Sequence, residues 1–122
     1  MIGKLQCVVL DCPEPEELAR FYQALLGGAV NQPAPPWAVD DDFATLHTGD
    51  GLVLAFQRVA GYRAPRWPDA EYPQQFHLDL DVEDIDRAQE QVLGLGAVLL
   101  RVEPAGWRVF ADPAGHPFCL LG

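Results

Sequence analysis

The chain has 122 residues, 49% of them hydrophobic, which is typical of one globular domain rather than a disordered chain. Its eight Lys and Arg against 18 Asp and Glu give a formal net charge of −10, which disfavours binding to nucleic-acid phosphates. No apolar run is long enough to span a membrane, and the first residues do not have the pattern of a signal peptide. We therefore expect a single domain over residues 1–122, located in the cytoplasm.

The cysteines agree with that location. Cys7, Cys12 and Cys119 are odd in number and do not have the spacing of a zinc ribbon. The sequence therefore predicts reduced thiols rather than a framework of disulfides.

The first half of the chain predicts a strand, a helix and further strands. Residues 7–11 alternate as a strand does, and Glu14 with Pro15 marks the start of a helix. The helix has an apolar stripe at three- and four-residue steps and ends near Gly28. Residues 31–40 are rich in proline and contain Trp37, which indicates an irregular loop or a damaged edge strand. Asp50 and Gly51 then open a strand over residues 52–57.

The second half repeats these features in the same order. Residues 77–81 alternate as a strand, Asp84 caps a helix, and Gly96 ends that helix. Its own apolar stripe is Ile85, Ala88, Val92 and Leu95. Residues 112–115 form a turn before a last strand at 118–121. The sequence therefore predicts an α+β fold of two βαβββ modules, at about 1–58 and 75–122. Residues 59–74 are the crossover, whose aromatic residues are suited to roofing a pocket.

Strand alternation predicts which side chains point away from the helices. Leu78 and Leu80 should pack on a helix, as should Leu52, Leu54 and Phe56 in the first module. The opposite face should then hold a shared set of side chains on one curved sheet: Cys7, Ala55, Gln57, His77, Asp79, Asp81 and Cys119.

Three stretches carry a resemblance to a known family: residues 8–22, residues 76–80 and residues 110–120. They resemble the vicinal-oxygen-chelate superfamily, which contains glyoxalases, bleomycin-resistance proteins and extradiol dioxygenases, and in particular its glyoxalase-like subgroup. The resemblance covers the whole chain. It implies a cup of curved mixed sheet with the helices on its outer face, and a homodimer.

The resemblance also locates a metal site. Metal-dependent members hold a divalent ion at four strand positions, which fall here on Cys7, Ala55, His77 and Cys119. Only His77 keeps the usual ligand type, and Ala55 offers no donor atom. Cys7, His77 and Cys119 are soft ligands that suit zinc. We nevertheless expect no metal and no other cofactor, because most of the ligand set is not kept.

Two functions follow from this resemblance, and the sequence leaves open which of them applies. One is a lyase or isomerase that acts on a small oxygenated metabolite, with His77 as the catalytic residue. The other is a protein that only sequesters a ligand, as bleomycin-resistance proteins do, where the acidic charge favours a cationic guest. In both, the ligand-binding cleft is predicted to contain Cys7, Trp37, Gln57, His77, Asp79 and Cys119.

Overall fold

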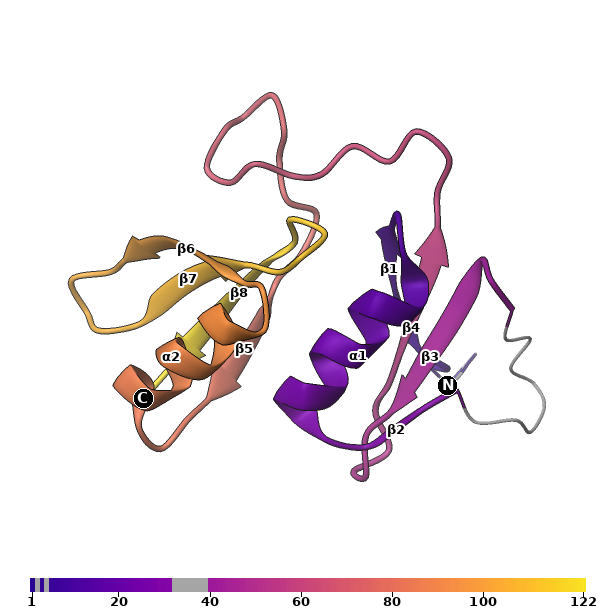
Figure 1. Ribbon diagram of the computed structural model, residues 1–122, viewed down its shortest axis with the longest axis horizontal. Coiled ribbons are helices and arrows are strands. Elements are labelled where there is room, and N and C mark those ends of the chain that lie inside the picture. The colour runs from indigo at the N-terminus through magenta and orange to yellow at the C-terminus, as the bar shows by residue number, and fades with distance from the viewer. Residues whose placement is uncertain (2, 4, 32–39) are drawn as a thin grey trace. The chain divides into compact units, whose positions relative to one another are not determined.

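The computed structural model describes residues 1, 3, 5–31 and 40–122, so the predicted cleft residue Trp37 lies outside the described residues. The chain divides into two compact units, Met1–Tyr62 and Arg63–Gly122. Each unit holds one helix and a four-stranded mixed sheet, in the order strand, helix and three strands (Figure 1). The predicted α+β class and the two βαβββ modules are therefore confirmed.

The first unit contains five elements. They are β1 (Val8–Cys12), α1 (Pro15–Leu26), β2 (Ala29–Val30), β3 (Phe43–His47) and β4 (Val53–Arg58). The sheet order is β1-β4-β3-β2, with β1 parallel to β4 and the other pairs antiparallel.

The core of the first unit lies between α1 and its sheet. Leu18 and Tyr22 of the predicted apolar stripe are buried, and the Tyr22 ring stacks on that of Phe56 with 5.8 Å between centroids. Leu10 and Leu46, from the neighbouring strands, are also buried. These apolar contacts hold the helix on one face of the sheet, and the side chains of alternate strand residues leave on the other face.

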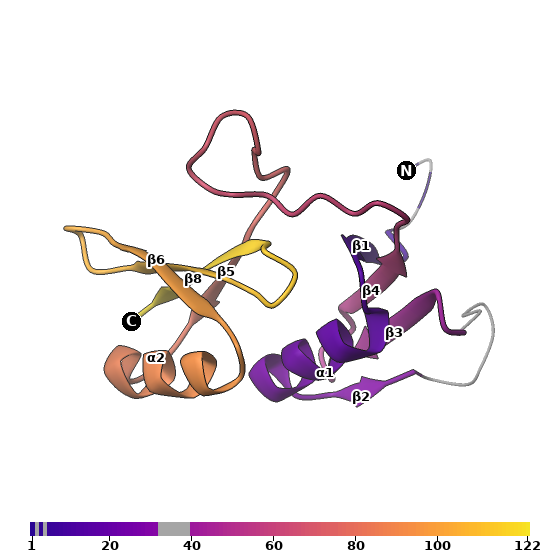
Figure 2. The ribbon, with the colours of Figure 1, turned by 45° about the horizontal axis from the view of Figure 1, so that its top comes forward.

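The second unit repeats this plan. It contains β5 (Leu78–Asp81), α2 (Ile85–Gly94), β6 (Val98–Val102), β7 (Arg108–Ala111) and β8 (Pro117–Leu121). Its sheet order is β5-β8-β7-β6, again with one parallel pair. Figure 2 shows α2 along one face of this sheet. Across the described ranges, no helix is both long and apolar enough to traverse a lipid bilayer.

Polar contacts fasten α2 to its sheet. Asp84 caps the helix as predicted, since its carboxylate accepts a hydrogen bond from the Arg87 amide at 3.1 Å. Arg108 of β7 donates to Asp86 at 2.7 Å and to Gln89 at 3.0 Å. Val92 of α2 is buried. The helix is therefore held by a small apolar contact and an arginine that reaches two of its turns.

Three sequence expectations differ from the structure. Leu52 is 39% exposed because β4 starts one residue later and the Leu52 carbonyl closes the turn with Thr48. Leu95 is 41% exposed because α2 ends at Gly94. The strands also form two open sheets rather than one curved sheet, because each module pairs its first strand with its own last strand.

Glycine is required at two of the repeated turns. Gly28 has a φ of +94°, and a Cβ there would lie 2.4 Å from the carbonyl oxygen of His47. Gly115 has a φ of +95°, and a Cβ there would lie 2.8 Å from the Ala64 Cβ. The turn before β8 therefore packs closely against the crossover segment.

The same turn yields a stability prediction. Asp112 is 3% exposed, and its carboxylate accepts hydrogen bonds from the amides of Ala114 at 2.8 Å and His116 at 3.0 Å. Asp112→Ala leaves these amides without that acceptor, so we expect the free energy of unfolding to fall by about 2 kcal/mol. Urea denaturation measures this loss. Asp112→Asn keeps one acceptor oxygen and should lose less, and equal losses would contradict the interpretation.

Candidate functional site

Three side chains that can bind a metal ion or take part in proton transfer, those of His77, Asp79 and Cys119, converge on the face of the second sheet that points away from α2. Asp79 of β5 lies opposite Cys119 of β8 in the parallel register, and His77 precedes β5 on the same face. One ligand atom from each of the three lies within 4.8 Å of the others, and the His77 Nε2 is 3.4 Å from the Asp79 Oδ1. His77 and Asp79 remain about half exposed, whereas Cys119 is buried.

A hollow of about 250 Å³ opens beside this cluster, entirely within the second unit. We call it the second-unit hollow. Two tryptophans, Trp67 from the crossover and Trp107 from the β6–β7 turn, belong to its lining. The full lining is Trp67, Gln74, His77, Glu103, Trp107, Val109, Pro117 and Cys119. Aromatic walls with a few polar groups are typical of sites for small organic molecules.

The lining contains one unsatisfied acceptor. The Gln74 Oε1 is buried and, among the described residues, has no hydrogen-bond partner. A buried amide oxygen without a donor costs free energy that a bound donor would recover. The second-unit hollow is therefore suited to a ligand that carries an N–H or O–H group.

Backbone hydrogen bonds fix two of the lining residues beside each other. The Glu103 amide donates to the Trp107 carbonyl at 2.9 Å, and the Gly106 amide donates to the Glu103 carbonyl at 2.9 Å. These bonds close the β6–β7 hairpin, so Glu103 and Trp107 reach the hollow from the two ends of one tight turn.

Two carboxylates act on the Cys119 thiol at the hollow. Burial, above all, raises the pKa of the Cys119 thiol to about 11, with further contributions from a hydrogen bond and the charge of Asp79 and from the charge of Glu103. Cys119 is therefore a neutral thiol at physiological pH. The two carboxylates that disfavour a thiolate would favour a cation in the same place.

The first unit does not repeat the cluster. Val9 lies opposite Ala55 in β1 and β4, where the second unit has Asp79 opposite Cys119. Cys7 precedes β1 as His77 precedes β5. The group His77, Asp79 and Cys119 is the one set of three such ligands within the part of the chain that the structure describes. That Cys7 and Gln57 join the same cleft as His77 stays a prediction.

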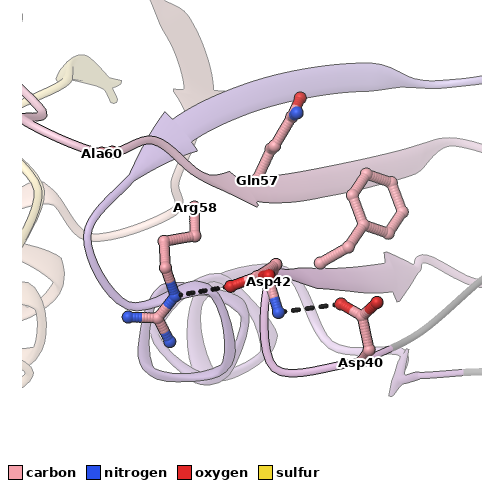
Figure 3. Close-up of a pocket in the computed structure, with 6 residues that line it drawn as sticks. Asp40, Asp42, Gln57, Arg58 and Ala60 are labelled. Carbon is pink, nitrogen blue, oxygen red and sulfur yellow. Dashed lines mark hydrogen bonds and ion pairs between the residues drawn. The ribbon is translucent and has the colours of Figure 1, made fainter.

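Gln57 lines a different hollow, of about 420 Å³, within the first unit. Figure 3 shows the Gln57 side chain leaving β4 on the opposite side from that of Arg58. The Arg58 Nε lies 3.0 Å from the Asp42 carboxylate, and Asp40 accepts a bond from the Asp42 amide at 2.8 Å. The lining is Asp40, Asp42, Phe43, Gln57, Arg58 and Ala60. Arg58 and Asp42 thus pair with each other. Among the described residues, the group of His, Asp and Cys ligands lies at the second-unit hollow, which is therefore the better candidate.

Sequence reasoning did not identify Gln74, Glu103 and Trp107 as site residues. Glu103 and Trp107 flank the segment Pro104–Gly106, and a hairpin turn could have been predicted there from the proline and glycine. Their place in the hollow depends on the tertiary fold. Gln74 carries no signal in the sequence.

The fold defines a protein of two βαβββ modules, and the family to which the chain belongs follows from its sequence. The model of the glyoxalase-like domain matches residues 7–121, and the chain belongs to that family. No curated protein matches the sequence.

Solved structures with the same fold span nearly the whole chain. The fosfomycin resistance protein FosX from Mesorhizobium loti is 18% identical, with a TM-score of 0.66 and coverage of 98% of this chain and 91% of that one. A possible glyoxalase from Bacillus cereus is 15% identical, with a TM-score of 0.68 and full coverage of both chains. A glyoxalase/bleomycin resistance protein/dioxygenase family enzyme from Burkholderia phytofirmans is 19% identical, with a TM-score of 0.67 and coverage of 97% of each chain. At these identities the likeness shows the fold alone.

The donor atoms of the second-unit cluster fit a divalent metal of intermediate softness. His77, Asp79 and Cys119 offer nitrogen, oxygen and sulfur, and three such ligands with one open side are typical of catalytic zinc. Magnesium and manganese prefer oxygen ligands, of which the cluster has few. The sequence prediction that the protein needs no cofactor stays a prediction.

The environments of the thiols predict an order of reactivity. Cys7 is half-buried, whereas Cys119 is buried and its pKa is raised to about 11. We expect iodoacetamide at pH 7.5 to modify Cys7 well before Cys119, because the thiolate is the nucleophile. Peptide mass spectrometry measures both rates.

Asp79→Asn removes a charge and a hydrogen bond that raise the pKa of Cys119. It should speed Cys119 modification, because a lower pKa leaves a larger fraction of the thiol as thiolate at the same pH. Asp81→Asn, on the same strand, is the matched control. Equal Cys119 rates in the two variants would show that Asp79 does not act on the thiol.

Proposed function

We propose that this glyoxalase-like protein binds a small oxygenated molecule in the second-unit hollow and moves one of its protons, as a lyase or isomerase. The observation that supports this is the convergence of His77, Asp79 and Cys119 beside a hollow walled by two tryptophans. Few groups in proteins take and return protons near neutral pH as readily as an imidazole does.

The pairing of His77 with Asp79 suits such a role. The Asp79 carboxylate lies 3.4 Å from the His77 Nε2 and favours the tautomer that carries its proton there. The Nδ1 then keeps its lone pair and is the atom that accepts a proton from the ligand. The carboxylate also stabilises the imidazolium that results. The neutral Cys119 thiol beside them donates its hydrogen bond to the Asp79 carboxylate and so helps to hold that carboxylate beside His77.

A bound divalent metal would change the assignment of His77. His77, Asp79 and Cys119 would hold such an ion, which would polarise the oxygens of the ligand as a Lewis acid. His77 cannot be both a ligand and a free base. The metal content of the purified protein, and of the protein after chelation and zinc addition, therefore has to be measured first.

Sequestration without chemistry is the second candidate. It is supported by the two tryptophans and by Ala55, which offers no donor atom at the position that corresponds to Cys119. The carboxylates of Asp79 and Glu103, whose charges act on Cys119, favour a cationic guest under this proposal. The predicted homodimer and the predicted lack of nucleic-acid partners belong to both candidates and stay predictions.

One variant separates the two candidates. His77→Gln should lower turnover of a hemithioacetal or α-hydroxyketone by about 100-fold or more, because it removes the proton acceptor. The melting temperature should change little, because His77 is 44% exposed. Initial rates and thermal unfolding are measured on both proteins, with Asp81→Asn as the control. Saturable binding in the hollow without turnover in the wild type would favour sequestration.

A further inference from the structure

One residue near the second-unit hollow has no role in the proposed chemistry. The Arg101 guanidinium lies over the Trp67 ring at 4.7 Å from the centroid. Its Nη1 is also 3.4 Å from the Glu103 Oε1. Trp67 and Glu103 both line the hollow, so a positive charge of the protein itself already occupies part of the lining.

An irregularity in β6 brings Arg101 to this place. Leu99 pairs with Phe110, and the next pair joins Arg101 to Val109, so that Leu100 is an extra residue in the strand. Phe110 is buried, with its ring stacked on that of Phe118, whereas Val109 belongs to the lining of the hollow. The bulge therefore turns Arg101 onto the face of the hollow, where regular alternation would have placed Leu100.

Arg101 satisfies only part of the hydrogen-bonding capacity of the Glu103 carboxylate. The Arg101 side chain is 47% exposed, and the separation of 3.4 Å is long for a bond between charged groups. The Glu103 side chain is only 19% exposed, and the Oε1 of Gln74, another lining residue, has no hydrogen-bond partner among the described residues. A smaller cation with several N–H groups would serve both oxygens better than the tethered guanidinium does.

We infer that Trp67, Glu103 and Gln74 form a subsite for a protonated amine or amidine of the ligand, and that Arg101 occupies this subsite until the ligand displaces it. The inference rests on the proposed function and adds the chemical class of the ligand: an oxygenated molecule that carries a cationic nitrogen. The tryptophan face attracts the positive charge, Glu103 pairs with it, and Gln74 accepts one of its hydrogen bonds.

Four probes of one shape test the class of the ligand. Benzylammonium, benzyltrimethylammonium, benzyl alcohol and benzoate are titrated into labelled full-length protein, and NMR follows the three tryptophan indole N–H signals. We expect benzylammonium to bind about fivefold or more tightly than benzyl alcohol, with benzoate the weakest. Benzyltrimethylammonium should fall below benzylammonium, because it has no N–H group for Gln74.

Arg101→Gln gives the sharper test, because the inference predicts that benzylammonium affinity rises in this variant rather than falls. Removal of the competing cation should tighten benzylammonium binding by about three- to fivefold. Arg87→Gln changes the net charge equally from an exposed position on α2 and should leave binding unchanged. Thermal unfolding confirms that both variants are folded.

The outcomes distinguish the inference from the proposed function. Tightest binding of benzoate or benzyl alcohol in the hollow, or weaker benzylammonium binding in Arg101→Gln, overturns the amine subsite and leaves the proposed function standing. If no probe of any charge shifts the signals of Trp67 and Trp107, the hollow is not a ligand site, and both proposals fail.

Discussion

The parallel pairing of β5 with β8 is the constraint on which the candidate site depends. Asp79 and Cys119 meet because Leu78 lies opposite Phe118 and Leu80 opposite Leu120. A slip of one residue would turn every side chain of one strand to the other face. Such a slip is costly, because Phe118 and Leu120 are fully buried in the core of the second unit. The apolar packing beneath the sheet thus fixes the polar cluster above it.

In the two modules, the residues that pack on the helix and the residues that could take part in chemistry lie on different faces of the same strands. Both sheets keep apolar residues toward the helix and the same strand order. On the opposite face, Val9 and Ala55 stand in one unit where Asp79 and Cys119 stand in the other. The two units thus keep the same strand pairing with different residues at these two outward positions. Only the second module, within the described residues, brings together the possible metal ligands His77, Asp79 and Cys119.

This division also decides what the sequence could predict. Alternation and helix caps predicted both modules and the common face of His77, Asp79 and Cys119, because these are local patterns with a fixed period. The bulge at Leu100 breaks that period, and no local pattern marks it. Residues of turns and of the crossover, such as Trp107 and Gln74, reach the hollow through tertiary packing alone. Whether the side chains of both units share one cleft depends on contacts that alternation does not encode.

The net charge of the chain and the charged groups at the hollow act on a cationic ligand in different ways. A net charge of −10 acts on any cation at long range and is screened by salt within about 10 Å. At the hollow, Asp79 lies beside His77, and Glu103 is already paired with Arg101. A cationic ligand therefore gains only the difference between its own contacts and those of Arg101. Selectivity in this hollow follows from the geometry of a few partners, with the overall acidity contributing mainly to the rate of encounter.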